Sequence, residues 1–379
     1  MIGLSLAAGA AALAIPTGFR PLPECTPTSQ TPCVIRHDWD VGELTKRLEA
    51  KDWIWWLDHD RLTVVAKKKQ YPWLLLCCDV QTPLEPIPSS DLLGVTVEIP
   101  SMDKAILQII PAPMPGQAAI IRGQNAPAEL ERSTPLKGKL VTRRIYSKET
   151  GGYRTLSIYT PPDISKTEKL PVLYLADDLA DDFAPIAEQA ILGKGARPAI
   201  IVGVSAAPVD LQCANSDCDR RSEEYLTDTI TPGKKNNRAY DKHQAFFLNE
   251  VVPYIERNYP ASRVRTDRCI GGTSNGASWA LTMAEASPER FGCVMAFSSG
   301  SGVAQDFAYR LKSVRVSGGY GTLDLKFAKT TKSILSKARI GGANVEEYSV
   351  VAGHSMIAWE YLFASAYSKL FSARIDHRR

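Results

Sequence analysis

Short apolar segments alternate with helix-like segments from about Lys137 to the end of the chain. Helical spacing of apolar residues is clearest in 243–259 and 327–340. Short apolar strands separated by helices are typical of a parallel sheet that helices cover on both faces. The pattern therefore predicts an α/β domain with a mostly parallel central sheet. We expect its strands in 138–147, 153–161, 170–178, 197–205, 267–274, 292–300, 312–321 and 345–354, the first two as antiparallel strands.

A smaller β-rich region precedes this domain. Strand-like runs occupy 61–68, 72–80, 94–100 and 104–112, and helical spacing is predicted over 39–60 through Leu44, Leu48 and Ile54. The Pro-rich stretch 111–135 is interpreted as a linker. We thus expect a β-rich domain over 23–127 and the α/β domain over 128–379. Three tryptophans are expected to be core or interface anchors, with a sugar platform as the alternative: Trp53, Trp55 and Trp56.

Composition excludes some classes of partner. Hydrophobic residues make up 44% and charged residues 23% of the 379 residues, as in an ordinary globular protein. The net charge is +4, and the run Lys67–Lys69 is interpreted as a solvated strand end rather than a phosphate-binding patch. We therefore expect a small-molecule substrate and no nucleic acid, while the oligomeric state stays open.

The first residues, 1–22, are predicted to be a signal peptide. They are small and apolar, and Ala12–Ala14 offers a cleavage site, although no Lys or Arg precedes the apolar run. The run is too short to cross a bilayer, which needs about 20 apolar residues. A periplasmic or secreted protein without integral membrane association is expected.

Eight cysteines are consistent with an oxidising compartment. Two disulfides are expected in loop-like sequence, Cys25 with Cys33 and Cys213 with Cys218. No Cys-x-x-Cys pair or histidine cluster offers four zinc ligands, so we expect no metal and no cofactor. Packing residues are expected instead at Cys77, Cys78, Cys269 and Cys293, the last two as free core thiols.

The stretch 269–278, CIGGTSNGAS, places Ser274 between Gly272 and Gly276. A strand that turns sharply into a helix leaves no room for side chains two residues before and after its apex. Such a turn directs the apex side chain out of the sheet. Ser274 is therefore a candidate nucleophile.

A base and an acid follow later strands. His354 comes after 345–353 and would take the proton of Ser274, while Asp324 would orient the imidazole. The order Ser, Asp, His is that of α/β-hydrolases. Asp306 is the alternative acid. The other histidines are not favoured, because they lie outside the α/β pattern, at a helix surface or at the chain end: His37, His59, His243 and His377.

An oxyanion hole needs two backbone N–H groups aimed at the same point. One is expected from Asn275, at the start of the helix after Ser274. The other is expected from the loop after 170–176, at Asp178 or Leu179.

Several motifs together make the sequence resemble the esterase D and enterochelin esterase branch of the α/β-hydrolases, over about 137–371. In that branch lie S-formylglutathione hydrolases and some feruloyl esterases. The resemblance implies a serine esterase fold, a neighbouring N-terminal domain, and Arg221 with Glu224 as a buried pair. The motifs are RSEEYL at 221–226, FFLNEVVPYIERNY at 246–259, GGTSNG at 271–276, GGYGTLD at 318–324 and GHSMIAWEYL at 353–362.

Two departures from this branch bear on function. Asp178 stands where relatives have a glycine after the strand, and we expect it to cap the following segment rather than to face the oxyanion. GHSMIAW replaces a GGHDW-like motif, which argues against a siderophore substrate. The leading hypothesis is an exported serine carboxylesterase; the alternatives are a siderophore or feruloyl esterase, or a catalytically silent binding protein.

Overall fold

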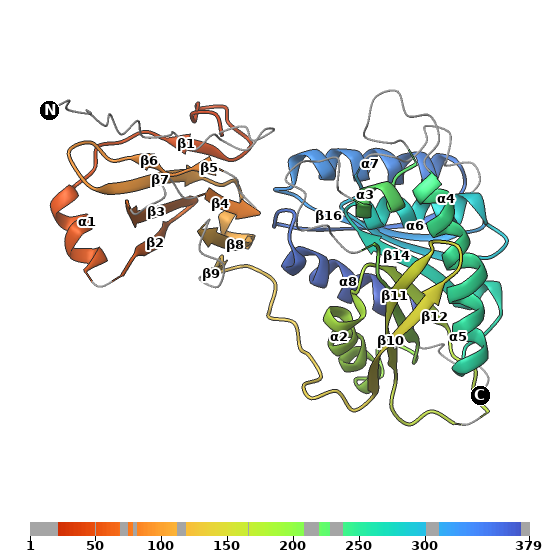
Figure 1. Cartoon of the computed structure of the whole chain (residues 1–379). Helices are drawn as coiled ribbons and strands as arrows, with labels where there is room; N and C mark the ends of the chain where they lie inside the picture. Colours follow the sequence, from red (N-terminus) through yellow and green to blue (C-terminus); the bar gives the residue numbers. More distant parts are fainter. Residues whose placement is uncertain are drawn as a thin grey trace, which may run out of the picture. The chain divides into compact units, whose positions relative to one another are not determined.

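The computed structural model describes residues 22–49, 51–68, 75–78, 82–111, 119–165, 167–207, 220–227, 238–300 and 311–372. They divide into two compact units, one up to Pro127 that also includes Val351–Ser355, and one formed by 128–350 and the residues from Met356 on (Figure 1). The expected signal peptide lies outside the described residues except for Leu22.

Two antiparallel sheets form the first unit. One has the strand order β1-β7-β3-β2 with β6 beside β7, and the other has the order β5-β4-β8-β9. The four strand-like runs of the sequence become β3, β4, β7 and β8, which confirms a β-rich unit. The bounds are β1 Cys33–Ile35, β2 Trp53–Asp58, β3 Arg61–Lys67, β4 Leu75–Cys78, β5 Thr82–Pro83, β6 Glu85–Pro86, β7 Leu92–Glu98, β8 Ile106–Pro111 and β9 Ala119–Arg122.

The helix predicted over 39–60 is too long. Helix α1 covers only Val41–Leu48, with Asp40 accepting from the Glu43 N–H at 2.9 Å, and Glu49 ends it at a positive φ of 32°. The following run of tryptophan and isoleucine forms β2, because aromatic and β-branched side chains favour a pleated surface. Ile54 still reaches the same small core as Leu44, but from a strand.

Two further features of the first unit were not predicted. Part of the expected linker, Ala119–Arg122, is strand β9, which pairs with β8. The segment Val351–Ser355 also belongs to this unit, and its Val351 carbonyl accepts a hydrogen bond from the Ile106 N–H at 2.8 Å.

The second unit contains an eight-stranded sheet with the order β10-β11-β13-β12-β14-β15-β16-β17. β10 and β11 are antiparallel, β11 is antiparallel to β13, and the remaining neighbours are parallel. A mostly parallel α/β sheet is therefore confirmed. Its strands are β10 Lys139–Ser147, β11 Gly152–Thr160, β12 Val172–Ala176, β13 Ile200–Val204, β14 Arg268–Thr273, β15 Cys293–Phe297, β16 Arg315–Gly321 and β17 Asn344–Val350.

Helices cover both faces of this sheet (Figure 1). On one face α2 packs against α8, where the rings of Phe183 and Phe363 stack 4.3 Å apart. On the other face, Trp279 of α6 shares a core with Tyr174 of β12 and Phe247. The bounds are α2 Ala180–Leu192, α3 Arg220–Tyr225, α4 Arg238–Phe246, a π-helical turn Phe247–Val251, α5 Val252–Asn258, α6 Asn275–Ala286, α7 Leu325–Ile340 and α8 Met356–Leu370.

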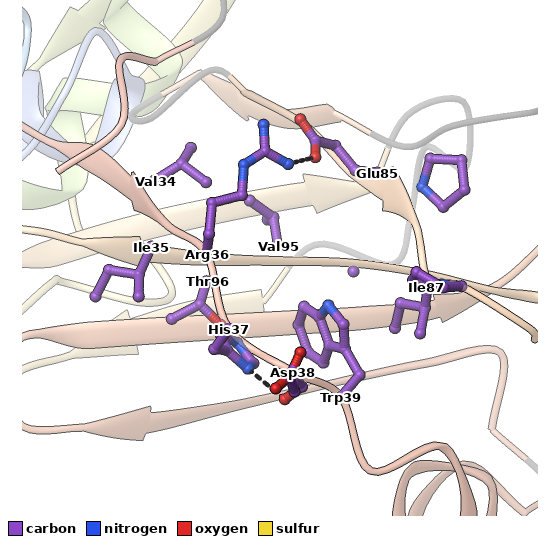
Figure 2. A pocket seen from close by; sticks show the side chains of 13 residues that line it. Val34, Ile35, Arg36, His37, Asp38, Trp39, Glu85, Ile87, Val95 and Thr96 are labelled. Carbon is purple, nitrogen blue, oxygen red and sulfur yellow. Dashed lines mark hydrogen bonds and ion pairs between the residues drawn. The ribbon is translucent and has the colours of Figure 1, made fainter.

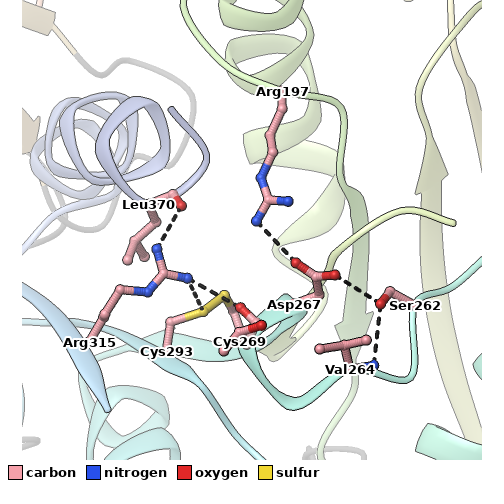
Figure 3. A network of polar contacts seen from close by, with 9 residues as sticks. Arg197, Ser262, Val264, Asp267, Cys269, Cys293, Arg315 and Leu370 are labelled. Carbon is pink, nitrogen blue, oxygen red and sulfur yellow. Dashed lines mark hydrogen bonds and ion pairs between the residues drawn. A yellow bond between two sulfur atoms is a disulfide. The ribbon is translucent and has the colours of Figure 1, made fainter. Parts of the chain in front are cut away.

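The second unit holds a disulfide that the sequence analysis did not expect (Figure 3). Cys269 and Cys293 face each other across β14 and β15 with their Cα atoms 4.6 Å apart, and they are bonded rather than free. Direct neighbours on parallel strands have the spacing that a bridge requires. The Arg315 guanidinium lies 3.4 Å from the Cys293 Sγ and donates to the Leu370 carbonyl at 3.1 Å.

The remaining cysteine predictions have mixed outcomes. The Cys25–Cys33 disulfide is present. Cys213 and Cys218 lie outside the described residues, as do the side chains of Cys77 and Cys78 on β4. Among the residues described, no helix combines the length and apolarity needed to cross a bilayer.

His243 lies in the core rather than on a helix surface. It is 0% exposed, with ring centroids 5.3 Å from Tyr225 and 5.6 Å from Trp279. Neither ring nitrogen has a hydrogen-bond partner in the described part of the chain. Burial, with a smaller contribution from the charge of Arg154, lowers the pKa of His243 to about 3. The imidazole is therefore neutral in the folded chain at ordinary pH.

A neutral buried histidine makes the fold sensitive to acid. The pKa of His243 is lower in the folded chain than the usual 6.5. The stability that its neutral imidazole contributes is therefore fully present above pH 6.5 and is lost as the pH falls towards 3. Between pH 7 and pH 5 the wild type should lose roughly 2 kcal/mol more unfolding free energy than His243→Leu. Urea unfolding at both pH values measures this difference, and equal losses in the two proteins would contradict it.

Candidate active site

Ser274 occupies the turn between β14 and α6, as the sequence predicts for a nucleophile. Its φ of 56° and ψ of −127° are strained for a residue with a side chain, and its own side chain makes no cap to the helix. The Ser274 N–H donates to the Phe297 carbonyl of β15 at 2.9 Å, which holds the turn against the neighbouring strand. Strained backbone of this kind is concentrated at functional sites.

The glycines on either side of Ser274 have a steric reason. A Cβ on Gly272 would lie 2.5 Å from the carbonyl carbon of Gly276, so the turn can close only without it. A Cβ on Gly276 would lie 2.7 Å from the Ala176 Cβ, at the end of β12. The small residues of the CIGGTSNGAS stretch therefore allow the turn between β14 and α6 to close and the start of α6 to pack directly against the end of β12.

Asp324 and His354 follow two other parallel strands of the same sheet. Asp324 is 7% exposed and lies three residues after β16, at the N-terminus of α7, which its side chain does not cap. His354 lies four residues after β17 and two before α8, within the segment Val351–Ser355. Asp306, the alternative acid, lies outside the described residues.

The residue with a left-handed backbone after β12 is Asp177, not Asp178. Asp177 has a φ of 63°, a conformation that aspartate tolerates better than most residues do. Its carboxylate accepts two hydrogen bonds from the Arg221 guanidinium, both at 2.7 Å. The Tyr225 hydroxyl accepts from the Asp177 N–H at 2.9 Å. This carboxylate, which would lie 3.4 Å from a Cβ on Gly276, is thus neutralised by an arginine.

Asp178 and Leu179, the expected oxyanion residues, come next in the chain. Asp178 is exposed, and Leu179 is buried and forms the N-cap of α2 without a side-chain cap. Asp178 therefore does not cap α2, which corrects the expectation for its side chain. The charge of Asp178 adds to burial in raising the pKa of Asp181.

Helix α3 connects the two halves of the expected oxyanion hole. Arg221 and Tyr225 bind Asp177 after β12, while the Ser222 hydroxyl accepts from the Asn275 side chain at 2.7 Å at the start of α6. Sequence reasoning missed Asp177, Ser222 and Tyr225, although two of them lie in the RSEEYL motif. Burial and the neighbouring Asp177 charge raise the pKa of Tyr225, which stays protonated.

The expected pairing of Arg221 with Glu224 is wrong. Arg221 binds Asp177, and Glu224 binds the buried Arg154 at 2.7 Å and accepts from the Ala207 N–H at 2.7 Å. Both residues lie on the short helix α3, but Arg221 binds the residue that follows β12 and Glu224 binds a residue of β11. Among the described residues, no group of histidine, cysteine, aspartate and glutamate side chains could hold a metal ion.

A serine at a strained strand-to-helix turn, in a mainly parallel sheet with helices on both faces, defines an α/β-hydrolase fold. The sequence also matches one family model, described as "Putative esterase", over residues 147–370, more than half of the chain. The chain therefore belongs to this esterase family.

Solved structures support the same fold. Enterochelin esterase from Shigella flexneri is 14% identical, covers 87% of this chain and 98% of its own, and has a TM-score of 0.61. Ferric enterobactin esterase from Salmonella typhimurium is also 14% identical, with 86% and 98% covered and a TM-score of 0.61. A ferulic acid esterase from Anaeromyces mucronatus is 18% identical, with 65% and 96% covered and a TM-score of 0.51.

Proposed function

We propose that this esterase-family protein is a serine carboxylesterase in which Ser274 is the nucleophile, His354 the base and Asp324 the residue that orients the base. The observation that carries the proposal is the strained conformation of Ser274 at the carboxyl end of β14, because active groups of parallel α/β sheets gather at that edge. The chain order of the three residues is that of an α/β-hydrolase.

Chain connectivity limits where His354 can lie. Four residues span at most about 14 Å, so its Cα lies within that distance of the end of β17. β14, β16 and β17 are parallel, and their carboxyl ends lie along one edge of the sheet. Ser274, Asp324 and His354 therefore each follow a strand that ends at this edge of the sheet.

The proposed reaction has two steps. The Ser274 hydroxyl is too weakly acidic to attack an ester alone, so His354 takes its proton as the Oγ bonds to the carbonyl carbon, and then passes the proton to the departing alcohol. Water, activated by the same base, hydrolyses the acyl-enzyme. The N–H of Asn275 and an N–H at Asp178 or Leu179 would stabilise the negative oxygen of each tetrahedral intermediate.

An enterochelin-type ester is the alternative substrate to a simple carboxylic ester. It is favoured by the coverage of the Shigella flexneri enterochelin esterase, which extends over 87% of this chain and so includes much of the first unit. We also propose that the protein is exported, since disulfides persist in oxidising compartments and the N-terminal run resembles a signal peptide.

A panel of p-nitrophenyl esters, feruloyl esters and enterobactin tests the proposed function. We expect saturable hydrolysis of at least one member by the purified chain. Hydrolysis of enterobactin alone would select the alternative substrate. No turnover of any member would contradict the proposal and favour a silent hydrolase fold used for binding.

Arg221 is expected to act as a positioning residue in this reaction. Arg221→Met would leave the Asp177 carboxylate without its partner, next to the backbone that must bind the oxyanion. The hydrogen bonds from this backbone to the oxyanion strengthen in the transition state. We therefore expect kcat to fall by up to about 100-fold while KM changes little. Steady-state kinetics on the best ester of the panel measures both constants.

Arg197→Met is the matched control for Arg221→Met. Arg197 pairs with Asp267 at 3.1 Å, and its side chain is 29% exposed, against 28% for Arg221 (Figure 3). Asp267 directly precedes β14, so this ion pair lies at the opposite end of that strand from Ser274. An equal loss of kcat in both variants would show that general destabilisation, not positioning, is responsible.

A further inference from the structure

The first unit contains a cavity of about 370 Å³ (Figure 2). This volume falls within the range of small-molecule sites, about 300–1,000 Å³. β1 and the segment that follows it form one wall, and β6, the two residues after it and part of β7 form the rest. Among the lining residues are Arg36, His37, Asp38, Trp39, Glu85 and Thr96.

The polar groups of this cavity are held in place before any ligand arrives. Arg36 donates to Glu24 at 2.9 Å and to Glu85, and these two hydrogen bonds raise its pKa. The His37 Nδ1 lies 2.9 Å from the Asp38 carbonyl and must donate to it, while the Nε2 lies 2.8 Å from the Thr96 hydroxyl. Thr96 is itself bonded to Thr63 within the sheet, at 2.9 Å.

An aromatic ring forms the apolar part of the cavity. One edge of the Trp39 indole lies over Gly94, which Ile87 also approaches, and its ring centroid is 4.2 Å from that of His37. In Figure 2 the indole nitrogen points to the side where Arg36 and Glu85 lie. The ring is thus fixed by packing, is half-buried and lines the cavity.

The charges around the cavity decide the class of ligand. The charged side chains that line the cavity are the carboxylates of Asp38 and Glu85 and the guanidinium of Arg36, and Arg36 also pairs with Glu24 outside the lining, so an anionic ligand would be repelled. Glu24 and Glu85 are both already paired with Arg36, so a cationic ligand would have to displace the Arg36 guanidinium. An uncharged ligand with hydroxyl groups and an apolar face matches these groups, because hydroxyls bond to carboxylates and C–H surfaces pack on indole.

We propose that this cavity binds a sugar unit of a neutral oligosaccharide, with Trp39 as the stacking residue and Asp38 and Glu85 as acceptors for sugar hydroxyls. The proposal assigns a binding function to the first unit and does not depend on the esterase reaction. The three tryptophans of β2, expected to be core or interface anchors, do not line this cavity: Trp56 packs against the small core of the first unit and Trp55 is exposed.

Calorimetric titration of the full chain with xylohexaose, cellohexaose and maltohexaose tests the proposal. We expect one of the three to bind, and Trp39→Ala to weaken that binding about tenfold or more. Trp55→Ala is the control, since Trp55 is exposed in the same unit and does not line the cavity. Its affinity should equal that of the wild type.

A second variant keeps the test valid if Trp39→Ala fails to fold. Asp38→Asn changes an exposed side chain, retains its shape and removes the charge-assisted hydrogen bond, so affinity should fall severalfold with no change in thermal unfolding. Three results would overturn the proposal: no binding of any hexasaccharide at millimolar concentration, unchanged binding in Trp39→Ala and Asp38→Asn, or tighter binding of hexagalacturonate or choline.

Discussion

Ser274→Ala is expected to lower kcat for ester hydrolysis by roughly four to six orders of magnitude. The alanine removes the oxygen that would form the acyl-enzyme in the proposed reaction, and water alone attacks the ester far more slowly. The fold should persist, because the Ser274 side chain does not cap α6 and the N–H bond to Phe297 involves only the backbone. Initial rates and circular dichroism of the purified variant measure the two effects.

Ser278→Ala provides the matched control for this variant. Ser278 lies four residues further on in α6, is 0% exposed, and has a hydroxyl without a hydrogen-bond partner in the described structure. Its replacement should leave kcat within a factor of about two, since no reacting atom or buried hydrogen bond is lost. A loss at Ser278 comparable to that at Ser274 would point to helix packing as the cause.

His354→Ala is expected to lower kcat nearly as much as Ser274→Ala, because an alcohol without a base is a poor nucleophile. The double variant should lose little more than either single variant, since the residues act as one unit. Steady-state kinetics of the three proteins measures this. A loss in the double variant equal to the product of the two single losses would contradict a shared proton transfer. His59→Ala is the control: it changes a side chain that is 95% exposed and should leave kcat unchanged.

The order of strands and helices could be predicted from the sequence because each parallel strand is a short apolar run with helical spacing on both sides. The Ser274 turn could also be predicted, since only small residues fit around it. The end of α1 could not, because the apolar positions Leu44, Leu48 and Ile54 fit a helix, while the tryptophans beside Ile54 favour a strand.

Other features depend on contacts between segments far apart in the sequence. Cys269 and Cys293 form a disulfide because β14 and β15 are neighbours in one register, which no local pattern reveals. His243 is buried because α4 turns it towards Trp279, although the polar residues beside it indicate a surface. The partners of Arg221 and Glu224 likewise follow from how α3 lies over the strand ends.

The turn that carries Ser274 was predicted from the sequence, whereas the contacts around it were not. Ser274 lies at the expected turn, and the roles of Asp324 and His354 remain predictions. The aspartate pair after β12 could not be resolved from sequence alone, since either residue could occupy the glycine-like conformation. Only the bidentate contact with Arg221 shows why Asp177 occupies it.

Labelling with a fluorophosphonate probe, followed by mass spectrometry of the tryptic peptides, tests the central claim most directly. Such a probe bonds covalently to a serine only where a base and an oxyanion hole activate it. We predict stoichiometric labelling at Ser274 in the wild type and none in Ser274→Ala or His354→Ala. Labelling that persists in Ser274→Ala, or a wild type that is not labelled at all, would contradict the assignment of this chain as a serine esterase.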